Sequence, residues 1–352
     1  MEITAEDLSS YLSGRLDDGD ADEVVVSDIT EHTEGWSRDT VSFTASWENE
    51  ERRLVARAES EQQATGDGFE GNDIETEFRT MEAAQDADVP VPETYWYEGD
   101  ESVLGNRFFV VEHLSGDAPV TWQSGEREKL YEAWDSDSSL PDAFVDAAAG
   151  VHEIRPEDVP FLDQTPPEDV VETEIDRWES VYRESALKEE PAVNEALRWF
   201  RTNAPEVPET TLVHGDFRVG NMLIDHEEDE ITGVLDWELA RVGDPLYDLG
   251  YASTLYFAGK LINPTERPEL ACSLLERDWF YDEYEKRTGR DVDRERVRYW
   301  RAFSAFVMMT IGLAGVRRYE AGKTDDVRSV WFQYIVPGLI EDILDIVRDD
   351  RV

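Results

Sequence analysis

The chain contains the run Leu212-Val213-His214-Gly215-Asp216-Phe217-Arg218-Val219-Gly220-Asn221-Met222-Leu223-Ile224, and the overall architecture can be inferred outward from it. Within this run Asp216 and Asn221 follow an apolar segment and stand five residues apart. A second motif, Val234-Leu235-Asp236-Trp237-Glu238, places Asp236 after another apolar segment. Apolar segments of this kind are typical of buried strands. We therefore expect a hairpin-like pair of strands that carries Asp216 and Asn221 at one end, with Asp236 beside them.

This set of side chains suits phosphoryl transfer. In that reaction an Asp orients or accepts the proton of the attacking hydroxyl, while an Asn and a second Asp bind the Mg²⁺ that bridges the nucleotide phosphates. Protein kinases use a D-x-x-x-x-N pattern followed by a metal-binding Asp. Asp216 and Asn221 have that spacing, and Asp236 stands where the metal-binding Asp is expected. Two unrelated acids of an acid-rich chain would not bring the apolar segments and the spaced Asn with them.

His214-Gly215-Asp216 stands where a protein kinase has His-Arg-Asp, and here the chain resembles the aminoglycoside phosphotransferase and choline kinase superfamily. The longer match, HGDFRVGNMLID with VLDWELARVGDPLYDLGY, is similar to the branch found beside or fused to acyl-CoA dehydrogenases. The resemblance implies an α+β, two-lobe protein-kinase-like fold. Residues 1–114 are then a small nucleotide-binding lobe with an antiparallel sheet, and residues 115–352 a larger, mainly helical lobe for catalysis and acceptor binding.

The composition sets the broad class of protein. The 352 residues are 40% hydrophobic, which is enough for one large or two modest domains with a core. No apolar run approaches the length of a transmembrane helix, and the first residues lack the features of a signal peptide. Cys272 is the only cysteine, which excludes an internal disulfide and a cysteine-rich metal site. We expect a soluble cytoplasmic protein without a membrane partner.

The chain is strongly acidic, with a formal net charge of −49. Self-repulsion of this size destabilises a compact chain at low salt, but at molar salt the Debye length falls to about 3 Å and screens it. We interpret the acids as a halophilic surface adaptation. A surface that binds a basic partner is the alternative, which the even spread of the acids disfavours. Binding to nucleic acid is also disfavoured, because it requires basic patches.

The N-terminal segment holds the residues that the resemblance connects with the nucleotide. Gly35 and Ser37 lie in a turn between strand-like segments, where backbone N–H groups can cover phosphates; a plain hairpin turn is the alternative. Arg57 occupies the strand position where the family usually has a phosphate-binding lysine, although an arginine is not equivalent to a lysine. A structural arginine at the strand edge is the alternative. Glu77, with Glu75 as its competitor, resembles the helix glutamate that pairs with this basic residue.

Other roles follow from the order of segments along the chain. The apolar run 108–114 resembles the hinge between kinase lobes, where main-chain groups around Glu112 and Leu114 read the adenine. His214 is expected to orient its loop, and Asp248 resembles the buried helix Asp that holds the catalytic loop in kinase folds. Arg218 either faces the substrate or pairs with a neighbouring acid, and the sequence does not separate these two roles.

The periodicity of apolar residues predicts the remaining elements. Strands are expected over residues 24–29, 41–45, 54–58, 94–97 and 108–114. Helices are expected over residues 5–16, 74–87, 126–134, 140–152, 170–189, 191–203, 249–260, 268–288, 292–318 and 325–348.

The sequence therefore predicts an ATP- and Mg²⁺-dependent kinase that phosphorylates a hydroxyl group of a small molecule. The branch resemblance makes a hydroxyacyl-CoA a candidate acceptor, and an aminoglycoside, choline or a sugar remains open. A nucleotide-binding pseudokinase module with little or no activity is the main alternative, because Arg57 replaces the usual lysine. A protein kinase is a weaker alternative, since no activation segment is recognisable after Asp236. The oligomeric state and the choice between ATP and GTP are left open.

Overall fold

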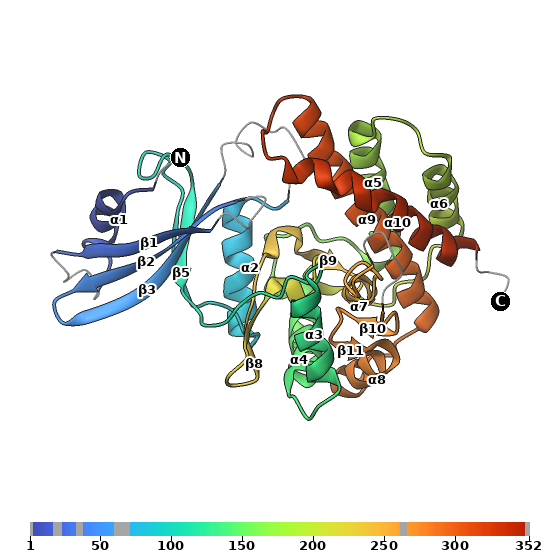
Figure 1. Ribbon diagram of the computed structural model, residues 1–352, viewed down its shortest axis with the longest axis horizontal. Coiled ribbons are helices and arrows are strands. Elements are labelled where there is room, and N and C mark those ends of the chain that lie inside the picture. Colours follow the sequence, from blue (N-terminus) through green and yellow to red (C-terminus); the bar gives the residue numbers. More distant parts are fainter. Residues whose placement is uncertain (1–2, 17–22, 33–37, 60–70, 261–265, 349–352) are drawn as a thin grey trace.

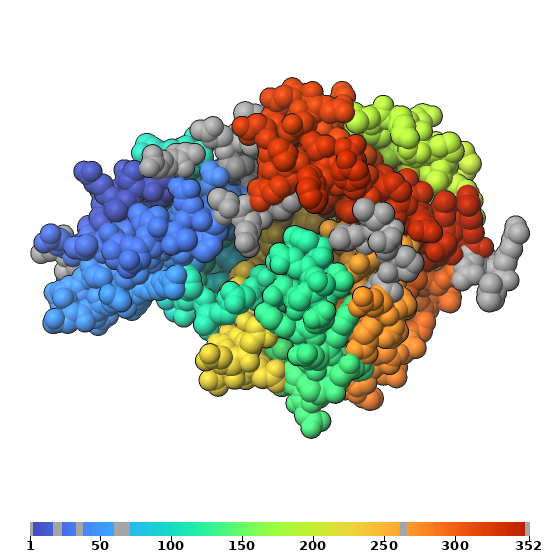
Figure 2. Space-filling model, in the orientation of Figure 1, coloured from blue at the N-terminus to red at the C-terminus, as the bar shows by residue number. Residues whose placement is uncertain are grey.

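The computed structural model describes residues 3–16, 23–32, 38–59, 71–260 and 266–348. It shows an N-terminal lobe built on a sheet and a larger helical part (Figure 1). The predicted α+β, kinase-like architecture is confirmed by the order of the helices and strands. Figure 2 shows the surface hollowed between the blue N-terminal lobe, the green segment of α3 (Ser124–Trp134) and the red C-terminal helices.

The N-terminal lobe is an antiparallel sheet with the strand order β1-β2-β3-β5-β4. Its strands are β1 (Val25–His32), β2 (Arg38–Trp47), β3 (Glu50–Glu59), β4 (Thr94–Glu98) and β5 (Phe108–Glu112). The sheet lies between two helices, α1 (Ala5–Leu12) and α2 (Ile74–Asp86).

The sequence of β5 explains this sandwich, because side chains alternate between the two faces of a strand. Phe108 packs edge-on against Tyr11 of α1, with ring centroids 4.8 Å apart. The next residue, Phe109, faces Phe78 of α2 at 5.7 Å. All four apolar residues of β5 are buried, because each face of the strand is covered by a helix. This explains why the sequence of β5 is a continuous apolar run. Helix α2 starts at its predicted N-cap, where the Asp73 side chain accepts from the Thr76 N–H.

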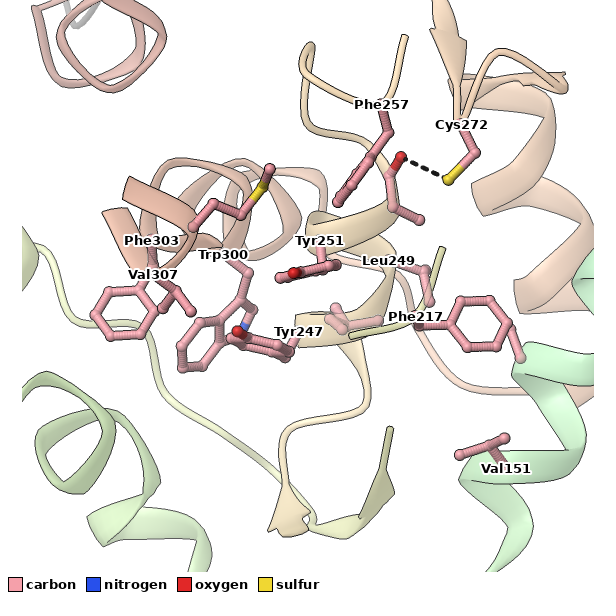
Figure 3. Packing of buried hydrophobic residues seen from close by; sticks show 14 of the residues in the cluster. Val151, Phe217, Tyr247, Leu249, Tyr251, Phe257, Cys272, Trp300, Phe303 and Val307 are labelled. Carbon is pink, nitrogen blue, oxygen red and sulfur yellow. Dashed lines mark hydrogen bonds between the residues drawn. The ribbon is translucent and has the colours of Figure 1, made fainter. Parts of the chain in front are cut away.

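The larger part is helical and encloses α9 (Arg294–Glu320). The other helices are α3, α4 (Leu140–Glu153), α5 (Val170–Ser185), α6 (Pro191–Thr202), α7 (Leu246–Ala252), α8 (Arg277–Thr288) and α10 (Arg328–Arg348). Figure 3 shows Trp300 and Phe303 of α9 packed beside Tyr247 of α7. The sequence predicts no apolar segment of transmembrane length, whereas α9 is long and apolar enough to cross a membrane. However, 78% of its most apolar stretch is buried inside the protein.

Short strand pairs bring the two motifs together. Strand β6 (Thr211–Val213) pairs with β9 (Arg241–Gly243), and β7 (Met222–Asp225) pairs with β8 (Glu230–Val234). The sequence predicts one pair of strands, whereas the structure has two pairs. The strand before Asp216 is β6, and it is hydrogen-bonded to β9. The prediction was incomplete because β9 is too short to give a periodic signal.

Two predicted helices differ from the structure. Helix α7 ends at Ala252, whereas a helix to residue 260 was expected. The helix expected from residue 268 starts only at Arg277, after the small strands β10 (Leu270–Ala271) and β11 (Leu275–Glu276). Between these strands Cys272 and Ser273 have positive φ angles, and the Cys272 N–H donates to the Ala252 carbonyl. This tertiary hydrogen bond overrides the local helix propensity. Three other elements, α1, α5 and β5, also end earlier than the sequence predicts.

Packing of α7 on α9 gives the first prediction, which concerns Gly250. A Cβ atom at Gly250 would lie 2.7 Å from the Trp300 Cβ and 2.8 Å from the Arg301 amide nitrogen. Since the backbone cannot give way cheaply, Gly250→Ala should lower the free energy of unfolding by about 1–3 kcal/mol. Chemical denaturation measures the change.

The matched control is Gly125→Ala, at the start of α3, where an added Cβ meets nothing within 4 Å. This variant should be neutral or slightly stabilising, because alanine has the higher helix propensity. Equal stability of the two variants would contradict the close approach of α7 and α9.

Candidate active site

The loop that follows β6 is tied to the helical core by one carboxylate. Asp248 of α7 accepts from the His214 N–H at 2.7 Å and from the Gly215 N–H at 2.9 Å. Its Oδ2 also lies 3.0 Å from Nε2 of His152 at the end of α4, and both side chains are fully buried. Burial alone raises the pKa of Asp248, but the bonds from His152 and His214 hold it below its ordinary value. Asp248 thus fixes the backbone immediately before Asp216.

The turn at Gly215 requires a glycine. Its φ is +84°, and a Cβ atom there would clash with the Leu239 carbonyl oxygen. The neighbouring His214 bridges both motifs: Nδ1 accepts from the Asp216 N–H at 3.2 Å, and Nε2 lies 2.9 Å from the Leu235 carbonyl oxygen. With both ring nitrogens engaged, His214 orients the loop, as its place in the sequence suggests.

Asp216 and Asn221 face each other across the loop. The Asn221 Nδ2 donates to the Asp216 Oδ2 at 2.8 Å and to the Asp216 carbonyl oxygen at 2.9 Å. The Arg218 Nε donates to the other carboxylate oxygen at 3.0 Å. Arg218 therefore pairs with the adjacent acid, one of the two roles that the sequence allows. These donors hold the Asp216 carboxylate, which is only partly exposed, in one orientation.

Asp236 is brought to the same place by β8. The Leu235 N–H donates to the Asn221 carbonyl oxygen at 2.8 Å, which joins the two motifs side by side. Asp236 itself has a left-handed conformation, with φ of 70°, a strained position for a residue other than glycine. In this conformation its carboxylate turns towards the N-terminal lobe and accepts from the Arg57 Nη2 at 2.6 Å.

Arg57 connects the two parts of the molecule. Its Nε lies 3.2 Å from the Glu77 Oε1, and its Nη2 is bonded to Asp236. Burial alone lowers the pKa of Arg57, but the charges of Glu77 and Asp236 raise it above its ordinary value. Burial alone raises the pKa of Asp236, and Arg57 then Arg218 hold it below its ordinary value. Glu75, the competitor of Glu77, instead faces Arg79 on the surface at 3.6 Å.

Sequence reasoning missed a second arginine at Glu77. The Arg38 Nε donates to the Glu77 Oε2 at 3.2 Å, and the Arg38 Nη2 donates to the Asn72 carbonyl oxygen at 2.6 Å. The Asn72 N–H in turn donates to the Glu238 carbonyl oxygen at 2.6 Å. Arg38 was not found because it starts β2 outside any motif, and its burial is visible only in the structure.

The other residues predicted to bind the nucleotide are Glu112, Leu114, Gly35 and Ser37, and their roles stay predictions. Glu112 ends β5, and its N–H donates to the Glu93 carbonyl oxygen at 2.9 Å. Leu114 follows in the link to the helical part, where its Cδ1 would lie 2.6 Å from a Cβ atom added at Gly233 of β8. Gly35 and Ser37 lie outside the described residues.

The donor set fits a hard cation of the Mg²⁺ type. Among the residues that the structure describes, the Asn221 Oδ1 and the Asp236 Oδ2 have no hydrogen-bond partner in the protein. Two protein oxygens are what Mg²⁺ takes when phosphates and water complete its shell. No group of three or more His, Cys, Asp or Glu side chains forms a metal site within the described ranges.

Comparison with known proteins gives the family context. The model of the phosphotransferase enzyme family matches residues 28–271. Acyl-CoA dehydrogenase family member 11 of Pongo abelii is 27% identical over 76% of this chain and 34% of that protein. Acyl-CoA dehydrogenase family member 10 of Mus musculus is 30% identical over 52% of this chain and 17% of that protein. The chain thus spans about a third or less of the length of these relatives.

Solved structures share the fold. A protein of Ralstonia eutropha assigned as an aminoglycoside phosphotransferase aligns with a TM-score of 0.75 and 22% identity over 99% of each chain. A variant of aminoglycoside phosphotransferase APH(4)-Ia, in a ternary complex with ADP and hygromycin B, aligns with a TM-score of 0.55 and 20% identity. That alignment covers 93% of this chain and 96% of the other. At these identities the likeness shows the fold.

Dependence of the loop on Asp248 gives the second prediction. An amide can no longer accept both backbone N–H groups, so Asp248→Asn leaves a buried donor facing another donor. We expect a loss of about 3 kcal/mol or more in the free energy of unfolding, measured by chemical denaturation. Glu128→Gln, at an exposed acid of α3, is the control and should be neutral. Similar stability of both variants would show that the loop does not depend on Asp248.

Proposed function

The chain belongs to the phosphotransferase enzyme family, and from this premise we propose that it transfers the γ-phosphate of ATP to a hydroxyl group of a small molecule. The observation that carries the proposal is the convergence of Asp216, Asn221 and Asp236 on one point, with Arg57 arriving from the N-terminal lobe. Positioning and charge stabilisation supply most of the catalysis in phosphoryl transfer, and this arrangement provides both.

Each residue receives a role from its contacts. Asp216, held by Asn221 and Arg218, orients the acceptor hydroxyl and takes its proton. Arg57, held by Glu77, steadies the phosphates with a planar guanidinium that can bond two oxygens. The outward oxygens of Asn221 and Asp236 would hold Mg²⁺, which supplies charge neutralisation between the phosphates.

We propose that the nucleotide lies between the lobes, with residues 1–114 forming the nucleotide-binding lobe and residues 115–352 the catalytic and acceptor-binding lobe. The adenine is read by main-chain groups near Glu112 and Leu114, and the Gly35–Ser37 turn covers the phosphates. The support for this placement is the order of segments along the chain and the link between β5 and the helical part.

A hydroxyacyl-CoA is our candidate acceptor. Its support is the similarity to proteins named as acyl-CoA dehydrogenase family members, of which this chain matches about a third or less. An enzyme joined to a dehydrogenase in relatives is expected to act on a compound of the same chemical class. Cytoplasmic location and a surface adapted to high salt are part of the same proposal, and the net charge of −49 supports the latter.

Asp216→Asn is the direct test. An amide cannot take the hydroxyl proton, so acceptor-dependent ADP release should fall by about 10²–10⁴-fold. Mg-ATP should still raise the melting temperature, because Arg57 and Asp236 are unchanged. The assay uses molar KCl, hydroxylated acyl-CoAs, sugars and amino alcohols. Glu228→Gln, at an exposed acid in the β7–β8 turn, is the control and should keep wild-type activity.

The alternative of an inactive nucleotide-binding module predicts another result. In that case Mg-ATP stabilises the wild type, but no acceptor in the panel gives ADP release. The observation that favours this alternative is the Arg57–Asp236 bond, because it occupies one oxygen of the proposed metal-binding Asp. Equal turnover by wild type and Asp216→Asn would instead reject the catalytic role of Asp216.

A further inference from the structure

Aromatic residues that belong to or follow α7 lie beside Asp216 and Arg218. Burial, with the negative charge of Asp216, raises the pKa of Tyr251 well above its usual value. Burial also raises the pKa of Tyr256, whose hydroxyl feels both Arg218 and Asp216. The Arg218 guanidinium lies 5.6 Å from the ring centroid of Phe257, which Figure 3 shows close to Tyr251. Tyr251, Tyr256 and Phe257 therefore form an aromatic wall next to Asp216 and Arg218.

Arg127 borders the same wall. It lies in the first turn of α3, and a Cβ atom added at Gly259 would be 2.7 Å from its Cδ and 2.8 Å from its Nε. Gly259 is two residues from Phe257, over which Arg218 lies. The α3 segment borders the hollow seen in Figure 2.

A second set of contacts places Arg127 near the loop. The Arg127 Nη1 donates to the Thr121 carbonyl oxygen at 3.1 Å. Two residues earlier, the Pro119 carbonyl oxygen is 3.3 Å from the Cβ position of Gly220, and the Arg218 Nη1 is closer still to that position. Arg127 thus contacts the 257–259 and 119–121 segments, and the same two segments also contact Arg218 and Gly220.

Within the described part of the chain, no acid neutralises the charge of Arg127. Although the chain has 82 acids, none of those in the described residues forms an ion pair or hydrogen bond with Arg127. Of the two acids adjacent to Arg127 in α3, Glu126 pairs with Lys129 at 2.9 Å and Glu128 is exposed. Arg127 is also half-buried, so its guanidinium has lost part of its hydration without gaining a counterion from these residues. An anion supplied by a ligand would satisfy it.

We propose, on the basis of the function proposed above, that Arg127 binds an oxyanion of the acceptor and selects anionic hydroxyl compounds. The oxyanion is a carboxylate or a phosphate, both of which match the guanidinium fork. A polycationic aminosugar would instead meet Arg127 and Arg218 beside the transfer point, where like charges oppose its binding. Arg127 is thus a specificity-determining residue outside both sequence motifs.

The test measures binding before turnover. Hydroxybutyryl-CoA, hydroxybutyrate, uncharged hydroxybutyramide and hygromycin B are titrated calorimetrically into protein saturated with AMP-PNP and Mg²⁺, at one KCl concentration. Arg127→Gln should weaken binding of the anionic probe by roughly ten-fold or more, since a charge-assisted hydrogen bond is lost. Arg127→Lys should restore much of the affinity because it keeps the charge. Lys129→Gln, on the same helix, should change nothing.

The four probes distinguish the sources of the oxyanion. If Arg127→Gln weakens the binding of hydroxybutyryl-CoA alone, Arg127 binds a phosphate of the coenzyme. If the variant weakens the binding of hydroxybutyrate, Arg127 binds a carboxylate. Hydroxybutyramide should bind wild type and Arg127→Gln equally. Unchanged affinity of Arg127→Gln for both anions overturns the inference, as does absence of anion binding by the wild type or tighter binding of hygromycin B than of either anion.

Turnover of the same probes then separates the two proposals. Arg127-dependent anion binding without ADP release would reject the proposed transfer reaction and keep the anion site. Transfer to an anionic acceptor whose KM is the same in wild type and Arg127→Gln would reject the anion site and keep the reaction.

Discussion

The rest of the site depends on the buried carboxylate of Asp248. A buried carboxylate is stable only when both of its oxygens are hydrogen-bonded. In Asp248 each oxygen accepts one backbone N–H, and Oδ2 also lies within hydrogen-bond distance of His152. Because those N–H groups belong to His214 and Gly215, the loop has a single backbone path into Asp216. Because His152 is also hydrogen-bonded to Tyr284 of α8, the helical core sets the position of the loop that carries Asp216.

The second constraint is the ion pair that joins the lobes. Arg57 and Asp236 are 179 residues apart in sequence and 2.6 Å apart in space. An arginine can serve here because it meets two acids at once: Nε faces Glu77 and Nη2 faces Asp236. A lysine presents one ammonium group on a flexible stem and would hold this three-residue geometry less firmly. Arg38 adds a second positive charge to Glu77, which keeps this buried acid balanced while Arg57 reaches towards Asp236.

Sequence reasoning identified the local parts of the candidate site. Asp216, Asn221 and Asp236 could be found from spacing after apolar strands, and α2 could be placed from the Asp73 N-cap with Glu77 on its inner face. It failed where distant residues decide the outcome. The end of α7 and the β10–β11 turn depend on a bond between Cys272 and Ala252, and the importance of Arg38 and Arg127 depends on neighbours contributed by other segments. No periodicity or motif encodes such contacts.

The acidity of the chain and the positive charge at the site act over different distances. A net charge of −49 would repel ATP and any anionic acceptor at low ionic strength, because the field of the whole protein then extends well beyond its surface. At molar salt the Debye length is about 3 Å, so that field is screened and only groups in contact interact. Arg57, Arg127 and Arg218 act at contact distance. An acidic surface and the proposed site for anions are therefore compatible when the salt concentration is high, because local contacts alone would then select the ligand.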